Sequence, residues 1–266
     1  MQQALDYLQE VKVLSSVLEV LDEGDFDQET LFKNWTLNDV LGHLYLFDVA
    51  VLKSLESDQA FVAFFAPIAA ELGKGKTLLQ AQYPWLDGLK GRALLEKWHG
   101  NSQNVADGFA ATDPKKRLKW AGPEMSALSS VTARQMETWA HGQEVFDVLG
   151  KTRNESDRIR NIAHLGVNTF AWTYVNRKLP VPDPAPFVRL TAPSGAVWEW
   201  NTPQEGNFVS GDAVEFARVV TQTRGVADTG LVTKGPVATG WMQIAQCFAG
   251  APEQPPTKGQ RHRKGS

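Results

Sequence analysis

A long helical segment near the middle of the chain carries an acid and a histidine one turn apart. The apolar spacing predicts a helix from about Ser126 to Gly150, and glycine suits the left-handed conformation at which many helices end. Glu137 and His141 lie four residues apart in this segment, so both side chains project from the same face. The surroundings of this helix face must therefore supply polar partners or solvent for both a carboxylate and an imidazole.

The polar face of this helix has two interpretations. It is a solvated face, with Trp139 and Phe146 on the opposite side entering the core, or it faces a buried site. His43 helps to decide between a solvated face and a buried site, because it lies in an earlier helical segment with few solvated positions. Such a histidine either donates a hydrogen bond to a backbone carbonyl in the core or serves as a metal ligand. If the two segments pack together, Glu137 is a buried carboxylate, which is costly unless a cation neutralises it.

His43, Glu137 and His141 would together form a site with three metal ligands. Three protein ligands with an open fourth position are typical of a metal ion that takes part in chemistry, whereas a structural zinc ion usually has four. The sequence therefore predicts a catalytic type of metal centre.

Composition narrows the remaining possibilities. The chain has 266 residues, 42% of them hydrophobic, and a formal net charge of −3, which gives no general attraction to nucleic acid or to acidic membranes. The single cysteine, Cys247, excludes an internal disulfide and is expected to be a buried structural thiol in the last helix. No run of about 20 apolar residues is present, as a bilayer-spanning helix requires. We expect a cytoplasmic protein that binds neither nucleic acid nor membranes.

The periodicity predicts an α+β protein with two domains and a tail. Four long helices are expected in residues 1–152 as a four-helix bundle, and a capping box at Thr36 and Asp39 should begin the second of them. A broken extra helix or lid is expected between the second and third helices, near Pro67. The long helices are predicted at residues 3–22, 37–57, 89–111 and 126–150.

A polar linker at residues 150–157 separates the bundle from a small α/β domain, residues 153–250. This domain is expected to hold a short antiparallel sheet, with a hairpin at Ser194 and Gly195. Its helices are predicted at residues 158–178, from about 212, and at 237–249. The proline-rich residues 251–266 are expected to be disordered.

Two motifs carry a resemblance to a known family. The pattern W-T-x-x-D-V-x-x-H-L at Trp35–Leu44, followed by R-x-x-E-x-x-x-H at Arg134–His141, resembles the N-terminal domain of mycothiol-dependent maleylpyruvate isomerases, which are DinB-like metal-binding four-helix bundles. The later runs VRLTAPSGAVWEWN and GWMQIAQCFAG resemble the small domain that follows the bundle, which is distantly similar to sterol carrier proteins.

The resemblance implies a divalent metal held by His43, Glu137 and His141, expected to be Zn2+, with Ni2+ or another divalent ion as the alternative. It further implies that a low-molecular-weight thiol is the cosubstrate and that its thiolate, bound at the open position, attacks a small electrophilic substrate. The oligomeric state stays open, a homodimer being one alternative.

Two arginines are candidate catalytic residues. Arg134, one turn before Glu137, would pair with that carboxylate, hold an acidic substrate, or form a surface ion pair. Arg224 matches an arginine of the second domain in the isomerase-like proteins, where it would face the metal cleft. Glu144 is either a further partner of the ligands or an exposed acid.

Two functions follow from these features. The first is a metal-dependent thiol transferase or isomerase. The second is a metal-binding protein without turnover, whose sterol-carrier-like domain binds an apolar ligand. The open coordination position favours the enzyme.

Overall fold

The computed structural model describes residues 1–265. The chain divides into two compact units, Met1–Val148 and Leu149–Ser266, and each is described by itself. Together they give an α+β protein, as the periodicity predicts. Within the described residues, every helix is too short or too polar to cross a bilayer.

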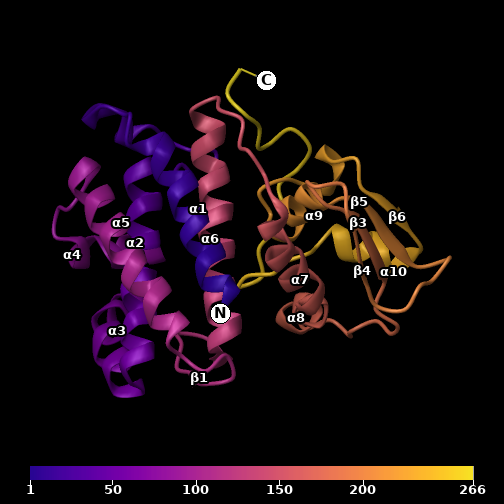
Figure 1. The fold of residues 1–266 in the computed structure, drawn as a ribbon, viewed down its shortest axis with the longest axis horizontal. Coiled ribbons are helices and arrows are strands. Elements are labelled where there is room, and N and C mark those ends of the chain that lie inside the picture. The colour runs from indigo at the N-terminus through magenta and orange to yellow at the C-terminus, as the bar shows by residue number, and fades with distance from the viewer. Residues whose placement is uncertain (266) are drawn as a thin grey trace. The chain divides into compact units, whose positions relative to one another are not determined.

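Unit 1 is built on four long helices that lie side by side in Figure 1. α1 packs against α5 and α6, and α2 contacts the same two helices from the other side. The expected four-helix arrangement is confirmed, with boundaries within four residues of those predicted. These helices are α1 (Gln2–Leu18), α2 (Leu37–Glu56), α5 (Gly91–Ala110) and α6 (Ala127–Val148).

The capping box at the start of α2 is present as predicted. The Thr36 hydroxyl accepts a hydrogen bond from the backbone N–H of Asp39 at 3.1 Å, and the Asp39 carboxylate accepts one from the Thr36 N–H at 2.9 Å. These bonds satisfy amide groups that have no partner inside the helix. The cap fixes where α2 begins and therefore the position of His43 two turns later.

Two further helices connect α2 to α5, where the sequence predicts a broken helix or a lid. They are α3 (Asp58–Gly73), which continues through Pro67, and α4 (Leu78–Leu86). Ile68 of α3 and Ala81 of α4 form a buried cluster with Leu46 of α2. This packing compensates for the backbone hydrogen bond that a proline removes from a helix interior.

Three short elements complete unit 1. They are the 3-10 helix η1 (Glu23–Asp27) and the antiparallel pair β1 (Arg117–Leu118) and β2 (Met125–Ser126), the pair being an addition to the prediction.

Unit 2 contains a four-stranded sheet in the order β4-β3-β5-β6. β3 and β4 form the expected antiparallel hairpin, but β5 runs parallel to β3, so the sheet is mixed rather than antiparallel. The reason is topological. β4 already pairs with one edge of β3, so the chain crosses to the other edge of β3, and β5 there runs opposite to β4 and therefore parallel to β3. β6, which was not predicted, pairs antiparallel with β5. The strands are β3 (Phe187–Thr191), β4 (Val197–Trp200), β5 (Phe208–Asp212) and β6 (Val232–Lys234).

The helices of unit 2 are shorter than the sequence predicts. The expected helix at 158–178 is interrupted at Thr169, whose hydroxyl donates to the carbonyls of Leu165 and Gly166 and whose ψ of 12° leaves the helical range. The last helix ends at Met242, so Cys247 lies beyond it and not inside it as predicted. Cys247 is buried, as expected, and its backbone N–H donates a hydrogen bond to the Val220 carbonyl. The helical elements are η2 (Asp157–Ile159), α7 (Arg160–Asn168), α8 (Phe170–Asn176), α9 (Ala213–Val220), η3 (Val226–Asp228) and α10 (Pro236–Met242).

The segment that follows residue 250 makes specific contacts, although its composition predicts disorder. The Glu253 carbonyl accepts hydrogen bonds from Arg177 and Gln222, and the Gly259 N–H donates to Asp228 at 2.9 Å. Pro256 is buried. Side-chain donors and acceptors of unit 2 thus satisfy a segment that has too few apolar residues to form a core of its own.

Candidate metal centre

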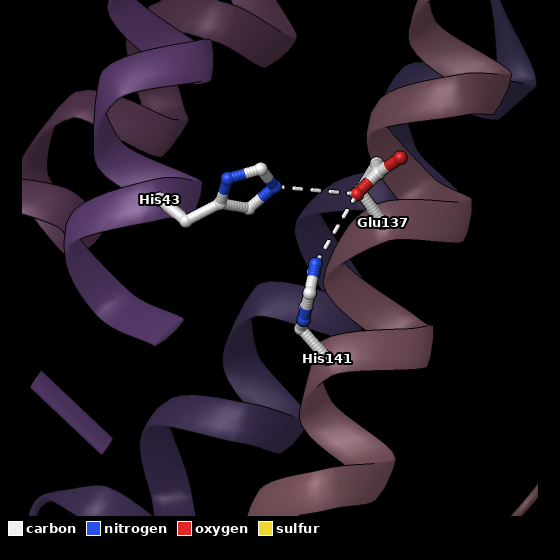
Figure 2. Close-up of side chains that lie close together, drawn as sticks. All are labelled: His43, Glu137 and His141. Carbon is white, nitrogen blue, oxygen red and sulfur yellow. Dashed lines mark hydrogen bonds and ion pairs between the residues drawn. The ribbon is translucent and has the colours of Figure 1, made fainter. Parts of the chain in front are cut away.

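The three predicted ligands meet inside unit 1. His43 projects from α2, and Glu137 and His141 project from the facing side of α6 (Figure 2). The Nε2 atoms of both histidines lie 3.4 Å from the same carboxylate oxygen, Oε2 of Glu137. One ligand atom from each residue lies within 4.8 Å of the other two. The solvated interpretation of this face of α6 is therefore wrong.

The two nitrogen–oxygen distances of 3.4 Å fit a shared metal ion. Zinc bonds to nitrogen and oxygen are about 2.0–2.1 Å long, so two ligands of a tetrahedral ion are separated by about 3.3–3.4 Å. A separation of 3.4 Å is long for an N–H···O hydrogen bond, which is normally about 2.7–3.2 Å. Each nitrogen–oxygen pair therefore has the separation of two ligands around a common centre, and the two imidazoles and one carboxylate suit several divalent ions.

Aromatic rings enclose the two imidazoles. The Trp35 ring stacks on His141 with a centroid distance of 5.7 Å and an interplanar angle of 4°, and Phe32 meets the same imidazole edge-on at 5.2 Å. Trp35 and Phe47 contact His43 at 5.4 and 4.8 Å. Within the described part of the chain, His43 Nδ1 is buried without a hydrogen-bond partner. Ring packing therefore orients this imidazole.

The protonation states suit metal binding at neutral pH. Burial lowers the pKa of His43 to about 4, although the neighbouring carboxylate of Glu137 acts in the opposite direction. Desolvation raises the pKa of Glu137, but the polar and electrostatic interactions with the imidazoles of His141 and His43 together outweigh it and hold this pKa well below its usual range. A neutral His43 and an ionised Glu137 are the forms that coordinate a cation.

Arg134 lies beside the cluster, but it is engaged elsewhere. Its Nε donates to Oδ1 of Asp48 at 2.9 Å, and its Nη2 donates to the carbonyl of Leu44 at 3.2 Å. The side chains of Arg134 and Asp48 are only 3% and 0% exposed, so this ion pair is buried rather than on the surface. The Asp48 carboxylate counteracts the effect of burial and raises the pKa of Arg134, which keeps the guanidinium charged.

Asp48 is the important residue that sequence reasoning missed. Its Oδ2 accepts hydrogen bonds from the Tyr7 hydroxyl at 2.6 Å and from the Trp98 indole at 2.9 Å, in addition to the Arg134 bond at Oδ1. Burial raises the pKa of Asp48, while these three donors lower it. One carboxylate on α2 therefore connects to α1, α5 and α6. An acid inside the apolar run LFDVAVL was the signal, because such a group needs buried donors.

Arg224 and Glu144, the two remaining candidates, are not members of the cluster. Arg224 belongs to unit 2, where its Nη1 donates to the Thr223 carbonyl at 2.8 Å, so its catalytic role stays a prediction. Glu144 is buried on α6 and is not an exposed acid. Two histidines outside the cluster have partners of their own: His99 lies 3.7 Å from Glu19, and the His164 imidazole accepts a hydrogen bond from the Trp200 indole at 3.0 Å.

Fold and site together define a helical-bundle protein with a His-Glu-His cluster that could hold a metal ion. Residues 7–146 match the family model described as the mycothiol maleylpyruvate isomerase N-terminal domain. The chain belongs to this family, as the two sequence motifs predict. The match stops at residue 146, so the resemblance of the later residues to sterol carrier proteins stays a prediction.

Similar proteins extend the match beyond the bundle. Uncharacterized protein Rv0036c of Mycobacterium tuberculosis strain H37Rv and uncharacterized protein MT0041 of strain CDC 1551 / Oshkosh are each 35% identical over 222 residues, which cover 82% of this chain and 84% of theirs. The crystal structure of the mycothiol-dependent maleylpyruvate isomerase matches with a TM-score of 0.51 at 14% identity, covering 82% of this chain and 87% of that one. A histidine-to-alanine mutant of that enzyme gives the same TM-score at 13% identity. These structures share the fold.

Proposed function

We propose that this protein is a metal-dependent enzyme that uses a low-molecular-weight thiol to attack a small electrophilic substrate, as a transferase or an isomerase. The observation that carries the proposal is the convergence of His43, Glu137 and His141 on one point with the spacing of metal ligands. Three ligands leave a coordination position for a substrate atom. The name of the structural relative, a mycothiol-dependent isomerase, supports a thiol in that position.

In this proposal, different residues of unit 1 hold the metal ion and enclose its ligands. His43, Glu137 and His141 would hold a divalent ion, for which we propose Zn2+, and a bound ion lowers the pKa of a coordinated thiol so that a thiolate exists at neutral pH. Trp35 and Phe47 pack against the imidazoles of His43 and His141, whose side chains are only 8% and 11% exposed. A thiolate in a partly dehydrated site is a stronger nucleophile than one in bulk water.

Cobalt substitution tests the thiol directly. The metal content of the purified protein is measured first, with about one divalent ion per chain expected. The protein is then loaded with Co2+ and titrated with glutathione, mycothiol, bacillithiol and cysteine. The matching thiol should produce a sulfur-to-cobalt charge-transfer band. If no thiol perturbs the spectrum, the thiol mechanism fails and a metal-binding protein without turnover replaces it.

The same proposal extends to residues and properties outside the cluster. We propose that Arg224 contacts the substrate, and Arg224→Met should then raise KM for the electrophile without changing the metal content.

A cytoplasmic location agrees with the single cysteine and with an intracellular thiol cosubstrate. The division into a bundle and a small α/β domain predicts that limited proteolysis cuts first in residues 150–157 or in the C-terminal tail.

A further inference from the structure

We infer that Asp48 is a positioning residue for the metal site and that it acts through Arg134; this inference rests on the metal site proposed above. Asp48 touches none of the three ligands in the contacts described here. It instead holds the guanidinium that joins the two helices from which the ligands project. The pair formed by Asp48 and Arg134, together with the Leu44 carbonyl, is called the α2–α6 brace below.

The brace lies beside the ligands on both helices. On α6, Arg134 precedes Glu137 by three residues, so the two side chains share one face. On α2, the Leu44 carbonyl belongs to the residue next to His43, and Asp48 follows one turn later. The guanidinium therefore attaches α6 to α2 at two points close to His43. The separation of His43 from Glu137 depends on this attachment.

The brace is rigid for three reasons. Its two side chains are excluded from water, so solvent does not compete for their hydrogen bonds. The second carboxylate oxygen of Asp48 is held by Tyr7 and Trp98, which prevents rotation of the carboxylate. A planar guanidinium also fixes the direction of both of its bonds, which an ammonium group on a flexible stem does not.

A metal site on two helices needs such a constraint more than the fold does. Ligand atoms must stay within a few tenths of an ångström of the positions that an ion requires, whereas helices can shift by more than that with little loss of packing. Replacing a buried ion pair by groups of similar volume often leaves stability nearly unchanged. Stability and metal geometry can therefore be separated by experiment.

The test compares the wild type with two brace variants and a matched control. The double variant Asp48→Asn/Arg134→Met removes both charges while leaving an amide oxygen for Tyr7 and Trp98. Arg134→Lys keeps the cation but loses the two-point attachment. The control, Ser54→Ala, removes a partly buried hydrogen bond of α2, from the hydroxyl of the buried Ser54 to the Lys119 carbonyl at 2.6 Å. Two measurements are made on each metal-free protein. Urea denaturation gives its free energy of unfolding, and titration of the folded protein with Co2+ gives its metal affinity and absorption bands.

Both brace variants should bind Co2+ about 10–100-fold more weakly than the wild type and show altered cobalt absorption bands, the usual effect of losing support for metal ligands. Ser54→Ala should keep the wild-type bands and affinity. If Arg134→Lys, or a folded double variant, binds within twofold of the wild type with unchanged bands, Asp48 has no positioning role. If the wild type itself binds no metal, the proposed function fails, and this inference fails with it.

Discussion

Metal binding should raise the thermal stability of the wild type, and removing one ligand should abolish the effect. The perturbation is His43→Ala, which deletes the proposed ligand that projects from α2. An ion that binds the native state stabilises it by about 2.7 kcal/mol when its free concentration is 100 times its dissociation constant. Because the ligands come from two helices, this stabilisation belongs to the folded bundle and is absent from the unfolded chain.

The expected shift in melting temperature follows from the size of unit 1. Met1–Val148 should have an unfolding entropy of about 0.3 kcal/mol/K, on the basis of about 2.1 cal/mol/K for each residue. A stabilisation of 2.7 kcal/mol then corresponds to about 9 °C. Calorimetry on chelator-treated protein, with and without added Zn2+, measures this difference.

The matched control uses a histidine outside the cluster. His99 is 43% exposed and pairs only with Glu19 among the ion pairs described. His99→Ala should keep the full metal-dependent shift, whereas His43→Ala should lose nearly all of it. The reasoning is refuted if His43→Ala is stabilised as much as the wild type, or if saturating Zn2+ fails to stabilise the wild type.

Three further predictions concern single residues. Thr36→Ala should lower the free energy of unfolding by about 1 kcal/mol in urea denaturation, because the cap of α2 is lost; an unchanged value would show that the capping box is dispensable. Gly166→Ala should destabilise unit 2 by about 1–2 kcal/mol in the same assay, since an added Cβ would lie 2.7 Å from Val220, and a more stable variant would contradict this packing. Glu137→Gln should weaken Co2+ binding by at least about tenfold in calorimetric titration, because the anionic ligand becomes neutral; equal affinity would remove Glu137 from the site.

Much of unit 1 could be predicted because its signals are local. The apolar spacing located the four long helices, and the Thr36 capping box fixed the first turn of α2. The spacing of Glu137 and His141 placed them on one face, and that pattern needs no knowledge of neighbouring helices. In unit 2, local patterns located the β3–β4 hairpin, but they overestimated the lengths of the helices.

Some features of the chain were determined only by tertiary contacts. Parallel pairing of β3 with β5 depends on which sheet edge is free, and periodicity within a strand does not contain that information. The contacts made after residue 250 depend on Arg177, Gln222 and Asp228, which are distant in sequence. The composition of the segment alone gave the opposite expectation.

The candidate metal centre also has some features that the sequence determines and others that only the tertiary structure decides. The sequence by itself determined the types of the proposed ligands and the placement of Glu137 and His141 on one face, because one turn of a helix fixes their relation. Only the tertiary structure brought His43 within 3.4 Å of Glu137, 94 residues away, and turned Arg134 towards Asp48. Helix packing decides such contacts, because a buried charge is stable only where the surrounding helices supply its partners.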